Sequence, residues 1–149
     1  MDIVNLIIGL AALGLSLWAL FFGSPKRVTV DVNKDVNITV GVGARDAARI
    51  IVTNHGSSAV SIRSIGLMAL DGSGAVDYER SKTDNAVLPE GPDLPAKVEP
   101  NGTLIWRYSD EILRPLGSQT DAVAYITIPR TLKNPQPREI RSERVITIS

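Results

Sequence analysis

The chain has 149 residues, of which 16 are Lys or Arg, 16 are Asp or Glu and 44% are hydrophobic. This length suits one domain with a short appendage, because a single core usually takes about 100 to 150 residues. The balanced charge argues against nucleic acid as a partner, and the absence of cysteine excludes disulfides and thiolate metal ligands. His55 is the single histidine, so a multi-histidine metal site within one chain is excluded as well.

An uncharged, strongly apolar run occupies residues 3–23. At about 1.5 Å per residue a helix of this run spans about 30 Å, which is the thickness of bilayer hydrocarbon. A cleaved export signal fits less well, because Asp2 is the only charged side chain before the run and bulky residues stand where a peptidase needs small ones. We therefore predict a transmembrane helix over residues 1–23, a juxtamembrane linker over 24–27 and one domain over 28–149.

Basic residues set the predicted orientation of the anchor. Lys26 and Arg27 directly follow the helix, whereas the short segment before it carries only Asp2 as a charged side chain. The positive-inside rule then places the C-terminal domain in the cytoplasm. The prediction is a single-pass protein of the inner, or cytoplasmic, membrane with the lipid bilayer as a partner.

Small and polar residues of the predicted helix recur with spacings of about three and four, the rhythm of a left-handed helix pair. They are Asn5, Gly9, Ala12, Ser16, Ala19 and Gly23. Small residues let membrane helices approach closely, and an intramembrane Asn can hydrogen-bond across a pair. The stripe is interpreted as a self-association surface that would make a homo-oligomer. The alternative is a chance pattern in a span rich in Leu, Ala and Gly.

After the predicted linker the hydrophobic pattern changes from continuous to alternating. Val28, Val30 and Val32 alternate with polar residues, and the alternation resumes over residues 36–42. Period two over this length is typical of half-buried strands. The Asn-Lys-Asp sequence at residues 33–35 is turn material, so we expect a hairpin that turns there.

Further segments rich in β-branched or aromatic residues and bounded by turn residues begin at Ala48, Val60, Ala75, Thr103, Ala122 and Arg144. Seven or eight strands in about 120 residues predict an all-β fold, an immunoglobulin-like antiparallel β-sandwich. Trp106, Tyr108 and Tyr125 are expected as core or corner aromatics. Residues 110–116 are expected to form one helical turn, the only helix predicted after the anchor.

Two stretches stand out from the strand pattern. Residues 81–95 contain three prolines and few β-branched residues, which indicates a long loop that is either functional or merely mobile. Residues 130–144 carry an excess of basic side chains, which favours contact with anionic lipid head groups if the domain lies against the membrane. The predicted headgroup contacts are Lys26, Arg27, Arg130, Lys133, Arg138, Arg141 and Arg144. The alternative is a solvated hairpin.

The sequences IIVTNHGSSAVSIRSIGLMALDG at residues 50–72 and LPAKVEPNGTLIW at residues 94–106 carry a family resemblance. They are similar to a loose group of uncharacterised bacterial and phage single-pass proteins with an N-terminal membrane helix and one immunoglobulin-like β-sandwich. Val98 stands where that group tends to have Leu, and Asn101 is inserted before the Gly of its turn. The resemblance implies the fold and no known activity.

Residues suited to catalysis are few. His55 lies in a Thr-Asn-His-Gly sequence typical of a turn, with serines close by. Asp77 and Glu79 would share one face of a strand and could act as a carboxylate pair, although a solvated strand face explains them more simply. The Gly-x-Gly sequence at residues 41–43 lacks the third glycine of a dinucleotide loop. We therefore expect no catalytic, cofactor-binding or metal-binding residues, and no enzyme.

These patterns favour a membrane-anchored, non-enzymatic interaction module that presents a β-sandwich to a protein partner at the membrane surface. In a phage or prophage, exclusion or immunity at the envelope would be a natural use. The alternatives are an exported domain that contacts cell-wall or host-surface ligands and a small lytic membrane protein.

Overall fold

The computed structural model describes residues 28–39, 43–83, 87–129 and 136–148, except for the side chains of residues 37–39, 43–44 and 80. The predicted transmembrane helix, its small-residue stripe and the linker lie outside these residues. Within them, no helix has the length and apolarity needed to cross a membrane. Antiparallel strands dominate, so the predicted all-β fold is confirmed. The strands are β1 (Val28–Thr39), β2 (Gly43–Asn54), β3 (Val60–Ile62), β4 (Ser64–Ala69), β5 (Ala75–Asp77), β6 (Ala96–Val98), β7 (Thr103–Tyr108), β8 (Thr120–Ile128), β9 (Arg138–Arg141) and β10 (Ile146–Ile148).

Strand β1 shows that the expected turn at residues 33–35 is wrong. β1 continues through these residues and pairs with β2 along its whole length. Ion pairs across the ladder hold the segment extended, because Lys34 Nζ lies 3.0 Å from Asp46 and the Asp35 carboxylate lies 2.8 Å from Arg49. Turn preference is a local tendency, and cross-strand pairing in a ladder outweighs it here.

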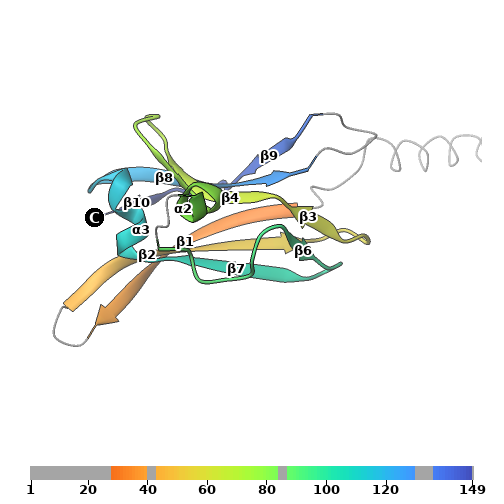
Figure 1. Ribbon diagram of the computed structural model, residues 1–149, viewed down its shortest axis with the longest axis horizontal. Helices are drawn as coiled ribbons and strands as arrows, with labels where there is room; N and C mark the ends of the chain where they lie inside the picture. Colours follow the sequence, from red (N-terminus) through yellow and green to blue (C-terminus); the bar gives the residue numbers. More distant parts are fainter. Residues whose placement is uncertain (1–27, 40–42, 84–86, 130–135, 149) are drawn as a thin grey trace, which may run out of the picture.

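The strands form two main sheets that lie over one another in Figure 1. The first has the order β1-β2-β7 and the second the order β10-β8-β4-β5, with β9 also pairing with β8. A small two-stranded sheet joins β3 to β6. Strand β8 is therefore central to the second sheet. It pairs with β4 on one side, and β9 and β10 follow one another along its other side.

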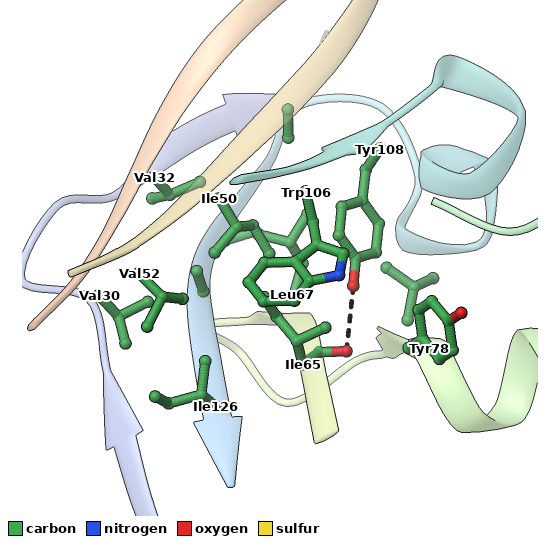
Figure 2. Packing of buried hydrophobic residues seen from close by; sticks show 14 of the residues in the cluster. Val30, Val32, Ile50, Val52, Ile65, Leu67, Tyr78, Trp106, Tyr108 and Ile126 are labelled. Carbon is green, nitrogen blue, oxygen red and sulfur yellow. Dashed lines mark hydrogen bonds between the residues drawn. The ribbon is translucent and has the colours of Figure 1, made fainter. Parts of the chain in front are cut away.

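The core lies between the two main sheets and accounts for the alternating hydrophobic pattern. Inward-facing residues of β1, β2, β4 and β8 meet there, around two aromatic side chains (Figure 2). Trp106 and Tyr108 are both fully buried, and the Tyr108 hydroxyl donates a 3.0 Å hydrogen bond to the carbonyl oxygen of Ile65. Tyr125 is buried as well, but it lies outside this cluster. The expectation that the aromatics are structural is confirmed for Trp106 and Tyr108.

Short helices connect strands at one end of the domain. Helix α2 (Tyr78–Thr83) was not expected, whereas α3 (Asp110–Leu113) and the 3-10 turn η1 (Arg114–Leu116) lie where one turn was predicted. Strands β6 and β9 were also not expected, and the described residues hold ten strands where seven or eight were predicted. Both missed strands are short, and β9 consists mostly of charged residues.

The two ends of the domain differ. Strand β1 begins, β8 ends and β9 begins at one end, which we call the Val28 end (Figure 1). The turn between β4 and β5, helix α3 and the last strand lie toward the opposite end, which we call the α3 end. Residues 1–27 precede Val28, so any anchor in them joins the domain at the Val28 end.

Candidate functional site

His55 lies in the bend after β2, as the sequence predicts for a turn residue. Its Nε2 atom is 2.9 Å from the Thr29 hydroxyl at an exposed position. The bend is held by Asn54, whose side-chain oxygen accepts a 2.9 Å hydrogen bond from the backbone N–H of Gly56. These contacts account for His55 structurally. Among the described residues there is no group of three or more His, Cys, Asp or Glu that could hold a metal ion.

The carboxylate pair considered at Asp77 and Glu79 is not formed on a strand face, because β5 ends at Asp77 and Glu79 lies in α2. The Asp77 carboxylate instead accepts a 3.5 Å hydrogen bond from the Tyr125 hydroxyl. Burial, and then the nearby charge of Asp77, raises the pKa of Tyr125 well above its ordinary value. Gly66 makes room for this aromatic ring, since a Cβ there would lie 2.7 Å from the Tyr125 hydroxyl.

Three of the predicted headgroup contacts are described, and all three are exposed on β9 or just after it. Arg141 donates a 2.7 Å hydrogen bond to Glu139, and Arg144 donates to Asn33 on β1 and lies 3.6 Å from Asp31. Acidic side chains therefore offset much of this positive charge. The other predicted contacts, Lys26, Arg27, Arg130 and Lys133, lie outside the described residues, as does the stripe of the predicted helix.

A groove of about 530 Å³ separates the free edge of β1 from the free edge of β9. We call it the β1/β9 groove, and its lining residues are Val28, Thr29, Val30, Asp31, Arg138, Glu139, Ile140, Arg141, Glu143 and Arg144. Three acidic and three basic side chains line it beside apolar Val28, Val30 and Ile140. The groove thus combines exposed strand edges with charges of both signs.

The free edge of β1 is capped by its own side chains. Asp31 accepts a 2.9 Å hydrogen bond from the backbone N–H of Val32, and Asp35 does the same for Val36. This bond, together with the charge of Arg49, holds the pKa of Asp35 below its ordinary value. Side chains that occupy edge amides block the addition of another strand.

A segment over residues 87–95, which we call the strap, covers the free edge of β7. Glu90 and Arg107 exchange two backbone hydrogen bonds, of 2.9 and 2.8 Å. The Trp106 indole N–H donates a 2.8 Å bond to the Pro92 carbonyl, and the Tyr78 hydroxyl donates a 3.0 Å bond to Asp93. The strap occupies much of the loop that was predicted over residues 81–95, and it has a structural role there.

A second hollow of about 530 Å³ lies at the α3 end, between the β4–β5 hairpin, α2, the strap and α3. We call it the α3 hollow, and its lining residues are Ser73, Gly74, Ala75, Val76, Asp77, Ser81, Val87, Glu111, Ile112 and Pro115. Apolar surface is available there, because Val87 is 45% exposed. Asp77 and Glu111 are the acidic residues of this lining.

The α3 hollow could not be predicted from the sequence, because it joins segments up to 42 positions apart, from Ser73 to Pro115. The closed edge of β7 was not predicted either. Gly91 is the residue whose identity could have indicated the strap. A Cβ at this position would lie 2.7 Å from the carbonyl oxygen of Ile105 on β7. Such close backbone approach is available to glycine alone.

No protein-family model and no curated protein matches the chain. The X-ray structure of structural genomics target SoR45 is similar to it with a TM-score of 0.43 and 10% identity, covering 83% of this chain and 86% of that one. A FixG-related protein from Vibrio parahaemolyticus gives a TM-score of 0.41 at 16% identity, covering 83% and 98%. A solution structure named as a late embryogenesis abundant (LEA) protein gives 0.38 at 16% identity, covering 97% and 84%. At these identities and scores the similarity assigns no function.

Proposed function

We propose that this chain is a membrane-anchored, non-enzymatic interaction module that binds a protein partner through the α3 hollow. The observation that carries the proposal is the position of that hollow at the α3 end, opposite the end at which residues 1–27 join the domain. An anchor at residues 1–23 would hold the hollow away from the bilayer. Tethering also raises the effective concentration of the module for partners at the same surface, so modest contacts suffice.

The lining of the hollow favours a partner segment with an apolar side chain beside a basic one. Val87 offers an exposed apolar contact, and Ile112 is buried beneath the surface. Asp77 and Glu111 place negative charge at the same hollow. Complementary charge steers a partner and sets its orientation, whereas apolar contact at the centre supplies most of the affinity.

We also propose that the domain is an immunoglobulin-like β-sandwich. The strand orders β1-β2-β7 and β10-β8-β4-β5 support this assignment. They correspond to the A-B-E and G-F-C-C′ orders of that fold, with β9 and β10 together in the place of the last strand. Its loops cluster at the two ends, which suits a module that is anchored at one end and binds at the other.

Site-specific photocrosslinking in cells tests the binding surface. We expect p-benzoylphenylalanine at Ala75 or Val87 to give the same adduct, which mass spectrometry would identify. The same group at Thr103, an exposed residue at the start of β7, is the matched control and should give none. Adducts that are equal at all three positions, or found only at Thr103, would contradict the proposal.

A charge reversal tests the chemistry of the same surface. Glu111→Lys should lower the yield of the adduct from Val87, because it removes negative charge from the hollow. Glu79→Lys makes the same change on α2, at a position that does not line the hollow, and should leave the yield unchanged. Equal yields from both variants would count against binding through the α3 hollow.

Topology separates this proposal from an exported surface-binding domain. The chain lacks cysteine, so Ser149→Cys provides a unique label site in the full-length protein. We expect a membrane-impermeant maleimide to react only after the membrane is broken, in keeping with a cytoplasmic domain. Labelling of intact cells would favour the exported alternative, and exclusion or immunity at the envelope of a phage-carrying cell would then lose its support.

A further inference from the structure

Strand β9 has one paired and one open side. It pairs with β8 from Tyr125 opposite Arg141 to Ile128 opposite Arg138, and its other side lines the β1/β9 groove. The direction of its backbone groups follows from Ser142, whose N–H donates a 2.8 Å hydrogen bond to the Ala124 carbonyl. Successive residues of a strand alternate in direction. Arg138 and Ile140 therefore turn their backbone groups toward β8, and Glu139 and Arg141 turn theirs outward.

The other sheet edges in the described part of the chain are less suited to pairing. Strap residue Glu90 occupies the edge of β7, and the carboxylates of Asp31 and Asp35 cap amides of β1. The edge strand of the second sheet on its other side, β5, has three residues and leads directly into α2. Strands β3, β6 and β10 also have unpaired edges, and each has only three residues. Short, capped or covered edges resist strand addition. The edge of β9 is left with two outward residues and four free backbone groups.

The side chains of β9 are complementary to a second copy of β9 that runs antiparallel to it. Two strands pair through residues whose backbone groups point toward each other, and on this side of β9 those residues are Glu139 and Arg141. Glu139 can therefore lie opposite either Glu139 or Arg141 of the other copy. Only the register centred on Ile140 places Glu139 opposite Arg141 at both positions. The two neighbouring registers place like charges opposite each other, which destabilises a strand pair.

We propose that two copies of this chain associate edge to edge through β9 in the register centred on Ile140. Two Glu139–Arg141 pairs then form across the interface, with four backbone hydrogen bonds between the copies. The existing bond of 2.7 Å between Arg141 and Glu139 within one strand becomes part of a square of alternating charges. The second sheets of the two copies join into one continuous sheet.

The pairing is isologous, because a two-fold axis exchanges the copies and the same residues contribute from each. The two copies of β9 run in opposite directions, so the two Val28 ends point apart. This contact is separate from the predicted stripe in the transmembrane helix and from the α3 hollow. It goes beyond the proposed function and does not depend on it: with an anchor at each Val28 end, the paired copies would join two facing bilayers and not share one.

Disulfide trapping tests the register in full-length protein in detergent micelles, where no shared bilayer restricts the orientation of two copies. Two Ile140 residues would form a non-hydrogen-bonded pair with Cα atoms about 4.5 Å apart, which is within disulfide range. In this cysteine-free chain, we expect Ile140→Cys to form a disulfide-linked dimer under mild oxidation. Ser118→Cys, in an exposed turn at the α3 end, is the control and should remain monomeric on a denaturing gel. A dimer yield at Ile140→Cys no higher than at Ser118→Cys would overturn the proposal.

Charge reversal keeps the proposal testable if Ile140→Cys disturbs folding. Glu139→Arg creates two like-charge pairs, and we expect it to weaken dimerisation about tenfold or more in analytical ultracentrifugation. Arg141→Glu should do the same, and the double variant should restore association, because it exchanges the two charges. A dimer that is insensitive to both reversals, or a double variant that stays as weak as the single ones, would refute pairing through β9.

Discussion

Asn54 is the polar residue on which the Val28 end of the domain most depends. Its side chain is fully buried, and its amide nitrogen donates to the carbonyl oxygens of Ser58 at 2.9 Å and Val98 at 3.0 Å. Its side-chain oxygen accepts from the Gly56 N–H at 2.9 Å. One amide therefore joins the bend after β2 to the end of β6. No hydrophobic residue of similar volume could satisfy these backbone groups.

Asn54→Asp tests this reasoning because it preserves shape and removes only the donor. The buried carbonyl oxygen of Val98 and the partly buried carbonyl oxygens of Ser58 and Glu99 lose this donor and instead face an oxygen. A buried acceptor without a partner costs about 1 to 3 kcal/mol, so we expect the free energy of unfolding to fall by about 3 to 4 kcal/mol at pH 7. This is a large part of the roughly 5 to 15 kcal/mol that holds a typical domain together.

The loss should depend on pH. A carboxyl group buried among carbonyl oxygens has a pKa above its unfolded value of about 3.9. At a pH below the unfolded pKa of about 3.9, the carboxyl group is protonated in both the folded and the unfolded states. The protonated group can again donate one hydrogen bond. At a pH above the unfolded pKa, this carboxyl group ionises in the unfolded state before it ionises in the folded state. The free energy of unfolding therefore falls as the pH rises toward the folded pKa. The difference between Asn54→Asp and the parent should therefore be smaller at pH 4 than at pH 7.

Urea unfolding of full-length protein in detergent micelles would measure the effect, with Trp18→Phe in the background so that buried Trp106 is the only tryptophan. Asn33→Asp is the matched control, because it makes the same change beside Arg144 on the outer face of β1. It should alter stability by less than about 0.5 kcal/mol, as surface substitutions usually do. The account of Asn54 would be wrong if Asn54→Asp cost less than about 1 kcal/mol at pH 7, or if its effect were equal at both pH values.

Three further outcomes are expected. Gly66→Ala places a Cβ 2.5 Å from the carbonyl oxygen of Val76 and should lower stability by about 1 to 3 kcal/mol in thermal unfolding, whereas Gly74→Ala, with its nearest contact at 3.6 Å, should have little effect. Asp35 has a lowered folded pKa, so its contribution is present above the ordinary value of 3.8 and is lost as the pH falls; Asp35→Asn should make unfolding less acid-sensitive in a pH titration. Trp106→Phe removes the 2.8 Å indole bond to the strap, and amide exchange along the strap should rise markedly; unchanged exchange would refute its anchoring role.

The strands that alternate in hydrophobicity could be predicted from the sequence, whereas the strands held mainly by their neighbours could not. Valines at every second position of β1 and the apolar runs of β4 and β8 carry their own signal, because burial on one face imposes period two. Strand β9, which reads Arg-Glu-Ile-Arg, carries no such signal and exists because β8 offers it a partner. The turn expected at residues 33–35 was wrong for a related reason, since the partners of Lys34 and Asp35 lie on another strand.

The binding surfaces show the same division. The basic residues at 138, 141 and 144 are visible in the sequence, and so is Glu139 beside Arg141. The contacts of Arg144 with Asp31 and Asn33 on β1 are identified only in space. Nothing in the local sequence places Val87 beside Ile112, or closes the edge of β7 while leaving β9 open.

By itself the sequence determined the all-β class, the absence of cysteine chemistry and the structural character of Trp106 and Tyr108, because composition and period two report the burial of each residue locally. It also supplied the prediction of an anchor in residues 3–23. Tertiary structure alone decided which strands are neighbours, which edges stay open and where the β1/β9 groove and the α3 hollow lie. Those features depend on contacts between segments that are distant in the sequence. The free energy of such a contact depends on both segments together, so the local sequence of either one does not reveal it.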